Sequence, residues 1–139
     1  MRSLSNTLLP MMVLLVLATS CTKDDDPKVA TRDDYLGLWQ CEEYDANQQL
    51  IATFQIEIIA HPSAEDKILM DNFTQLGFGF QAEAIVINTS IEIPQQFVSS
   101  AEVSGSGFIT NAHNGLELQY SFDDGSGQSE TITAACAKL

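Results

Sequence analysis

The chain has 139 residues, and its 19 acidic side chains outnumber its 6 lysine and arginine side chains, which gives a formal net charge of −13. This length suits a single domain of ordinary size. Because phosphate backbones repel so acidic a surface, the charge argues against nucleic acid as a partner and against direct binding to anionic lipid headgroups.

Residues 1–20 are predicted to be an export signal rather than part of the fold. Arg2 gives a short positive start, an apolar run covers residues 8–17, and small residues lead into Cys21. The apolar run is shorter than the roughly 20 residues that a membrane-spanning helix needs. We therefore expect cleavage before Cys21.

Residues 17–21 resemble the lipobox of bacterial lipoproteins, in which small residues precede an acceptor cysteine. The resemblance implies lipidation of Cys21, so that N-terminal acyl chains hold the protein to a membrane. Two acyl chains give stable anchoring, whereas one gives only marginal binding. The alternative is a plain secreted protein in which Cys21 is incidental.

Residues 21–34 are charged and lack apolar periodicity, which predicts a flexible tether between the lipid and the domain. Lys23 followed by three aspartates resembles the export signal that follows the lipidated cysteine in Bacteroidetes-type surface lipoproteins. This resemblance implies an outer-membrane location, exposed at the cell surface. The alternative is a solvated linker that carries no address.

Two further cysteines, Cys41 and Cys136, form an even pair that an oxidising compartment would allow to bond. Such a disulfide would close a loop of about 95 residues and stabilise the fold by about 4 to 5 kcal/mol in the chain-entropy description. Two buried free thiols are the alternative.

Short alternating apolar and polar runs, separated by turn residues, predict strands from residue 36 onward and no helix longer than one turn. The alternation is clearest over residues 116–122, where apolar side chains occupy the even positions. The eight expected strands are 38–44, 50–59, 67–71, 82–87, 90–93, 101–110, 116–122 and 129–138.

Three passages depart from simple alternation. Pro94 is expected to end the fifth strand, because proline cannot donate to a ladder. The glycines around Ser106 predict a bulge that changes the facing of side chains between Val103 and Phe108. The aromatic and glycine-rich residues 72–80 suit the lid or rim of a pocket, with a loop tucked into the core as the alternative.

Eight consecutive strands with short links predict an all-β domain over residues 35–139, arranged as an antiparallel eight-stranded up-and-down barrel. An open sheet would leave two costly edges, and closure pairs the first strand with the last. Closure would also bring Cys41 near Cys136, which the disulfide requires. A two-sheet sandwich is the alternative.

Residues 37–39 fit the Gly-X-Trp signature of lipocalins and the wider calycin group, so the domain resembles the calycin-like domains of Bacteroidetes-type lipoproteins. The resemblance implies that Trp39 plugs the closed end of the barrel. The glycine-rich sixth strand fits the same group. The chain departs from it in having no arginine near the C-terminus to cover Trp39, where Lys138 is the only late cation.

The sequence offers little catalytic chemistry, and we predict no enzyme, cofactor or metal site; a hydrolase is the least favoured function. His61 and His113 fall in turns and are expected to be solvated. Glu42 and Glu43 are adjacent on a strand, so they point to opposite faces and cannot act as a carboxylate pair. Glu43 shares the face of Trp39, and inside a barrel it would need a partner or a place at the mouth.

The family resemblance implies a non-enzymatic binding domain for a small apolar ligand or a surface protein partner. An interior cavity lined by aromatic side chains would favour the apolar ligand. A filled barrel would favour a protein-interaction or structural module, including one that resembles a protease inhibitor. The candidate ligand-binding residues are Trp39, Phe54, Phe78, Phe80 and Tyr120.

Overall fold

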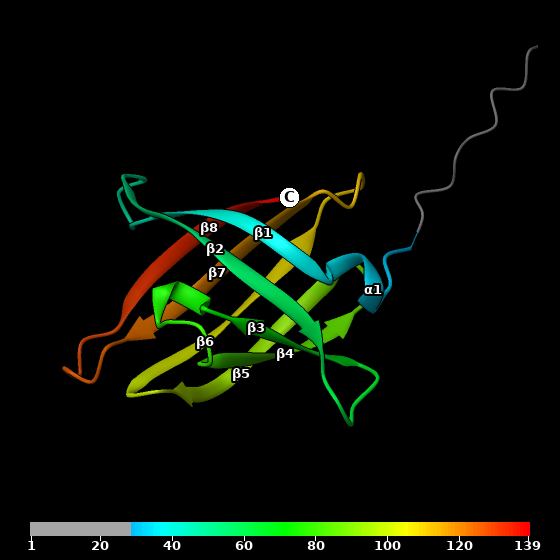
Figure 1. Ribbon diagram of the computed structural model, residues 1–139. Coiled ribbons are helices and arrows are strands. Elements are labelled where there is room, and N and C mark those ends of the chain that lie inside the picture. The colour runs from blue at the N-terminus through cyan, green and yellow to red at the C-terminus, as the bar shows by residue number, and fades with distance from the viewer. Residues whose placement is uncertain (1–28) are drawn as a thin grey trace, which may run out of the picture.

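The computed structural model describes residues 29–139 and shows a closed antiparallel barrel in which each strand pairs with its neighbours in the chain (Figure 1). This confirms the predicted eight-stranded up-and-down barrel and excludes the two-sheet sandwich. The elements are α1 (Arg32–Tyr35), β1 (Gly37–Tyr44), β2 (Leu50–Ala60), β3 (Lys67–Asp71), the 3₁₀ helix η1 (Phe73–Gln75), β4 (Gln81–Ile87), β5 (Ser90–Val98), β6 (Ala101–Ile109), β7 (Gly115–Asp123) and β8 (Glu130–Lys138).

The first and last strands close the barrel. β1 pairs with β8 in antiparallel register, with Cys41 directly opposite Cys136. A disulfide joins these two residues across the seam, with their Cα atoms 4.0 Å apart and 95 positions apart in sequence. The predicted disulfide is therefore confirmed, and it lies where the chain must hold its two ends together.

Strict alternation fills the barrel. On β1, Trp39, Cys41 and Glu43 point inward, and on β7 every second residue from Leu116 to Tyr120 does the same. This burial of one face of each strand is the main favourable term for a fold that lacks long helices. The other large side chains of the filled interior are Tyr35, Ile56, Ile58, Ile68, Met70, Phe73, Ile91, Ile93 and Val103.

The expected end of the fifth strand at Pro94 is wrong, because β5 continues to Val98. The register between β5 and β6 shifts between Ile93 and Gln96, so the extra residue of a bulge accommodates the proline that cannot donate. The side chain of Gln96 then replaces part of the ladder to β4: it accepts from the Glu83 N–H at 2.7 Å and donates to the Glu83 carbonyl at 2.8 Å.

The bulge predicted in the sixth strand is also wrong. The β6–β7 register runs without interruption, so Phe108 stays on the outer face and is 53% exposed. The glycines serve close approach instead of a bulge. A Cβ atom at Gly105 would lie 2.3 Å from the Gln119 carbonyl oxygen, and one at Gly107 would lie 2.4 Å from Leu118 Cδ2.

The two ends of the barrel are built differently, and we name them by their short helices. The α1 end holds α1 and the turns after β2, β4 and β6, whereas the η1 end holds the turns after β1, β3, β5 and β7. Ala30 is buried and α1 follows it, so residues 29–34, expected to belong to the tether, include ordered contacts with the barrel. No helix within residues 29–139 is long and apolar enough to cross a membrane.

Candidate functional site

Trp39 closes the α1 end and is completely buried. Its indole Nε1 donates to the Tyr35 carbonyl at 2.8 Å. Lys138 Nζ lies 5.3 Å from the centre of the Trp39 ring and donates to the Asp34 carbonyl at 2.7 Å. The sequence has no arginine near its C-terminus to cover Trp39, and a lysine takes that place in this chain. The contact is a cation–π interaction.

The Tyr35 and Asp34 side chains complete this end. The Tyr35 hydroxyl donates to the Asn88 carbonyl at 3.2 Å, and burial raises the pKa of Tyr35 to about 12. Hydrogen bonds from the Thr31 backbone and side chain, together with His113, lower the pKa of Asp34 to about 2. These contacts fix the start of the domain onto the barrel.

The expectation that both histidines are solvated is wrong, since each lies beside a carboxylate. His113 Nδ1 is 3.1 Å from Asp34 Oδ1, and His61 Nε2 is 3.4 Å from Glu83 Oε2. Both side chains are largely covered, at 12% and 20% exposed. Turn composition indicated where the histidines fall but gave no information about the segments that approach them, α1 for His113 and β4 for His61.

Glu43 lies inside the barrel toward the η1 end and is 2% exposed. The Tyr120 hydroxyl donates to Glu43 Oε1, and the Thr74 side chain also bonds Glu43. Burial raises the pKa of Glu43, and the two hydrogen bonds oppose that rise. The need for a partner at this position, inferred from strand parity, is confirmed, although the sequence did not identify Tyr120 or Thr74.

The loop between β3 and β4 plugs the η1 end. Phe73 is buried, and its ring centre lies 4.7 Å from that of Tyr120. Asn72 fixes the loop, because its side-chain amide donates to the Gln55 carbonyl at 2.7 Å and accepts from the Gly77 N–H at 2.9 Å. The loop is therefore tucked into the core at its start, as the alternative interpretation held.

The second half of that loop stays outside. Phe78 and Phe80 are 63% and 45% exposed. They lie at the η1 end, whereas Trp39 lies at the α1 end, and Phe54 and Tyr120 belong to the inner wall. The five candidate ligand-binding residues therefore do not converge on one site. None of the five lines any of four surface hollows found within residues 29–139.

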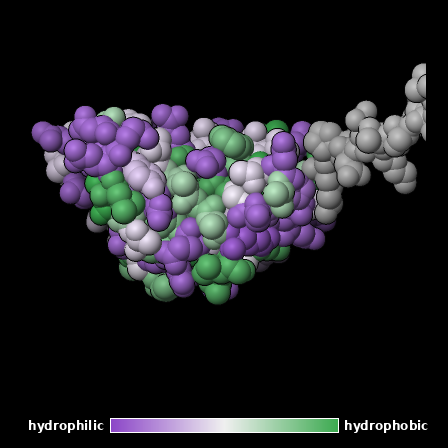
Figure 2. Space-filling view, turned by 90° about the horizontal axis from the view of Figure 1, so that it is seen from above, coloured by the Kyte–Doolittle hydropathy of each residue, from purple (hydrophilic) through white to green (hydrophobic). Residues whose placement is uncertain are grey.

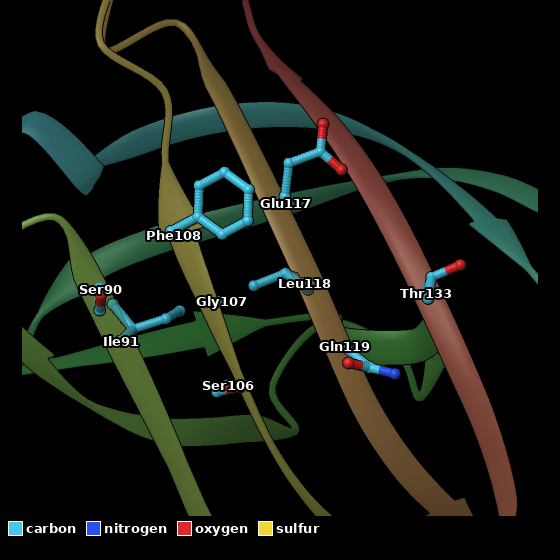
Figure 3. Close-up of a pocket in the computed structure, with 9 residues that line it drawn as sticks. All are labelled: Ser90, Ile91, Ser106, Gly107, Phe108, Glu117, Leu118, Gln119 and Thr133. Carbon is cyan, nitrogen blue, oxygen red and sulfur yellow. The ribbon is translucent and has the colours of Figure 1, made fainter.

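One of these hollows is a groove of about 420 Å³ on the outer wall of β5 to β8 (Figure 3). Its floor lies at Gly107, where the side chains of Ile91 and Leu118 point toward each other across the backbone. Phe108 and Glu117 stand side by side along its rim. The remaining lining residues are Ser90, Ser106, Gln119 and Thr133. We call this feature the Gly107 groove.

Sequence reasoning missed the Gly107 groove because it placed a bulge at the glycines and turned Phe108 inward. Simple parity would have found the correct facing, since Phe108 is an odd number of positions from the buried Val103. Separate apolar patches interrupt the hydrophilic surface on the face shown in Figure 2.

No protein-family model matches the chain, and no curated protein matches it. Among solved structures, it is similar to a redesigned β-barrel, with a TM-score of 0.55 and 11% sequence identity. The match covers 81% of this chain and 97% of the designed one. This likeness concerns the fold alone.

Proposed function

We propose that this protein is a lipid-anchored surface lipoprotein whose packed barrel acts as a protein-interaction module through its outer surface. The observation that carries the proposal is the filled interior. Trp39 occupies one end, Phe73 and Tyr120 occupy the other, and their contacts are completed by hydrogen bonds within the chain. Eight strands enclose just enough space for side chains or one small ligand, and here side chains take that space.

The anchor is the second part of the proposal and rests on the resemblance of residues 17–21 to a lipobox. Cys21 lies outside the described residues. The described chain enters the barrel at the α1 end, so an anchor attached there would leave the η1 end and the strand walls accessible to partners. A Cys21→Ala variant should move from the membrane to the soluble fraction, and a variant that stays with the membrane would contradict lipidation.

Native mass spectrometry of the full chain purified from its own host tests the filled interior. We expect the mass of the protein with its acyl chains and no further molecule. A retained apolar molecule, lost when Phe54 or Tyr120 is replaced by a bulkier or polar residue, would instead support the small-ligand function. A Phe73→Ala variant is the positive control, because removing the plug opens space beside Tyr120.

A further inference from the structure

We infer that the Gly107 groove binds an arginine side chain presented by a basic protein segment. This inference rests on the proposed function, because it names the partner class of the outer surface. It depends on three features of the groove that occur together: an exposed aromatic ring beside a carboxylate, a floor of strand backbone at Gly107, and an acidic surrounding wall.

The ring and the carboxylate come from directly paired residues. Phe108 and Glu117 face each other in the β6–β7 register, and both point outward. Directly opposed Cβ atoms in antiparallel strands lie about 4.5 to 5.5 Å apart. A guanidinium group can therefore stack on the Phe108 ring while its N–H groups bond the Glu117 carboxylate, which a compact ammonium group does less well.

The floor suits the aliphatic stem of the same side chain. Position 107 faces the barrel interior, so on the outer wall the floor of the groove is strand backbone, and the 53% exposed Phe108 ring provides the apolar surface beside it. Long cationic side chains bury their methylene groups on such surface while the charged head stays in a polar setting. The Ser106 hydroxyl and the Gln119 side chain lie at the edge of the groove as further hydrogen-bonding groups.

The surrounding charge selects a cation. Across the outer wall, Glu117 pairs with Ala135, and Ala135 pairs with Glu42 on β1, so the two carboxylates flank a small residue. Two strand spacings separate them by about 10 Å. The residues that line the groove include Glu117 but no lysine or arginine. The formal net charge of −13 adds a long-range attraction for basic partners.

The same pairing recurs at the other end of β6. Phe97, which is 72% exposed, lies directly opposite Glu102 in the β5–β6 register. Phe108 follows Glu102 by six positions on the strand, which corresponds to about 20 Å. An extended basic segment lying along β6 would thus meet a second Phe–Glu pair, and its arginines would be bound at both.

Binding of a labelled ten-residue peptide of alternating arginine and glycine to the full chain tests the inference by fluorescence anisotropy. The matched peptide carries citrulline in place of arginine, which keeps the shape and removes the charge. We expect saturable binding of the arginine peptide and none of the citrulline peptide. Phe108→Ala and Glu117→Gln should each weaken the affinity by about threefold to tenfold.

Glu57→Gln is the matched control, because Glu57 is an exposed carboxylate on β2, away from the groove, and its replacement changes the net charge equally. We expect its affinity to stay within twofold of the parent. Equal weakening by Glu57→Gln and Glu117→Gln would mean that only total charge attracts the peptide and would overturn the inference. Absence of arginine-peptide binding, or equal citrulline binding, would overturn it as well. None of these outcomes concerns the interior, so the mass-spectrometric test of the packed barrel stays separate.

Discussion

The two ends of the barrel are both closed by aromatic side chains, but different kinds of backbone hold those side chains in place. At the α1 end, Trp39 belongs to β1 and Lys138 to β8, so paired strands position the contact. At the η1 end, Phe73 comes from a loop and reaches Tyr120 on β7. Strand residues therefore close the α1 end, whereas the loop between β3 and β4 closes the η1 end.

The backbone of the η1-end plug is less favourable. Asn72, Thr74 and Gln75 have φ values of 58°, 46° and 61°, in the left-handed region. Asparagine tolerates this region, whereas the β-branched Thr74 does so at a cost of order 1 to 3 kcal/mol. The plug also covers the one buried glutamate of residues 29–139. We therefore expect the η1 end to open before the α1 end, and the predictions below test that difference.

Removing the disulfide should have the largest effect, because it lies on the inner faces of β1 and β8 between the two ends. The double substitution Cys41→Ala with Cys136→Ala should lower the free energy of unfolding by about 4 to 5 kcal/mol. Urea denaturation of the parent and the variant measures it. A loss below about 1 kcal/mol would show that the strand ladder alone keeps the seam closed.

Replacing the aromatic plugs should affect the two ends unequally. Trp39→Ala should cost about 3 to 5 kcal/mol, because the strands around Trp39 cannot collapse into the cavity. Phe73→Ala should lower the free energy of unfolding by at least about 1 kcal/mol less than Trp39→Ala does. The reason is that a loop relaxes more readily than paired strands and releases the strain at Thr74.

Native-state hydrogen exchange resolves the same difference within one molecule. In Phe73→Ala, faster exchange should be confined to amides at the η1 end, whereas Trp39→Ala should accelerate exchange throughout the barrel. Uniform acceleration in both variants would mean that the barrel opens as one unit and that the two ends are equivalent.

Much of the α1 end could be predicted from the sequence, because it is made of strand residues with regular parity. Alternation placed Trp39 and Cys41 on one face, and the positions of the two half-cystines indicated which strands meet. The contact of Lys138 with Trp39 was not predicted, although closure of the barrel brings those two strands together. The periodicity of the sequence predicts which face of a strand each side chain occupies, but the pairing of the strands decides which side chains become neighbours.

The η1 end and the Gly107 groove were less predictable for physical reasons. Left-handed backbone is usually predicted from glycine, but here it occurs at Thr74 and Gln75. The inward turn of Phe73 therefore leaves no pattern in the sequence. At β6, a glycine pair fits either a bulge or a close approach between strands, and the unbroken register with β7 decides for close approach. Pro94 misled for a similar reason, because the compensating bond comes from the Gln96 side chain.

Glu43 should make the η1 end sensitive to pH. Its pKa is raised in the folded state above the ordinary value of 4.5, so the folded protein holds the proton more tightly than the unfolded chain does. The stabilisation from this proton is present below pH 4.5 and is lost as pH rises toward the folded-state pKa. Each pH unit by which the folded-state pKa of Glu43 exceeds that of the unfolded chain corresponds to about 1.4 kcal/mol in the free energy of unfolding.

A Glu43→Gln variant isolates this contribution, since glutamine keeps the carbonyl acceptor for Tyr120 and does not ionise. The unfolding free energy of the parent minus that of the variant should fall between pH 4 and pH 8, with other titrating groups cancelling in the difference. A difference that stays level across this range, or rises, would mean that Glu43 is not held protonated by the barrel interior.

Lys138 provides the smallest effect and the sharpest probe of the α1 end. Lys138→Met keeps the aliphatic stem but removes the charge over Trp39, and it should cost about 0.5 to 1 kcal/mol. Lys67→Met is the matched control, because Lys67 Nζ forms an ion pair with Glu83 Oε1 at 2.6 Å on the barrel wall. Partly exposed pairs of that kind contribute about 1 kcal/mol or less, so stability alone will not separate the two variants.

The emission of Trp39 separates them, because it is the only tryptophan of the chain. Loss of the ammonium group beside the indole should shift the Trp39 emission maximum in Lys138→Met and leave it unchanged in Lys67→Met. If both spectra match the parent while the fold is intact, the lysine acts through its bond to the Asp34 carbonyl, and the ring contact contributes nothing of its own. The α1 end would then be closed by a hydrogen bond between β8 and α1, with Trp39 only filling the space inside.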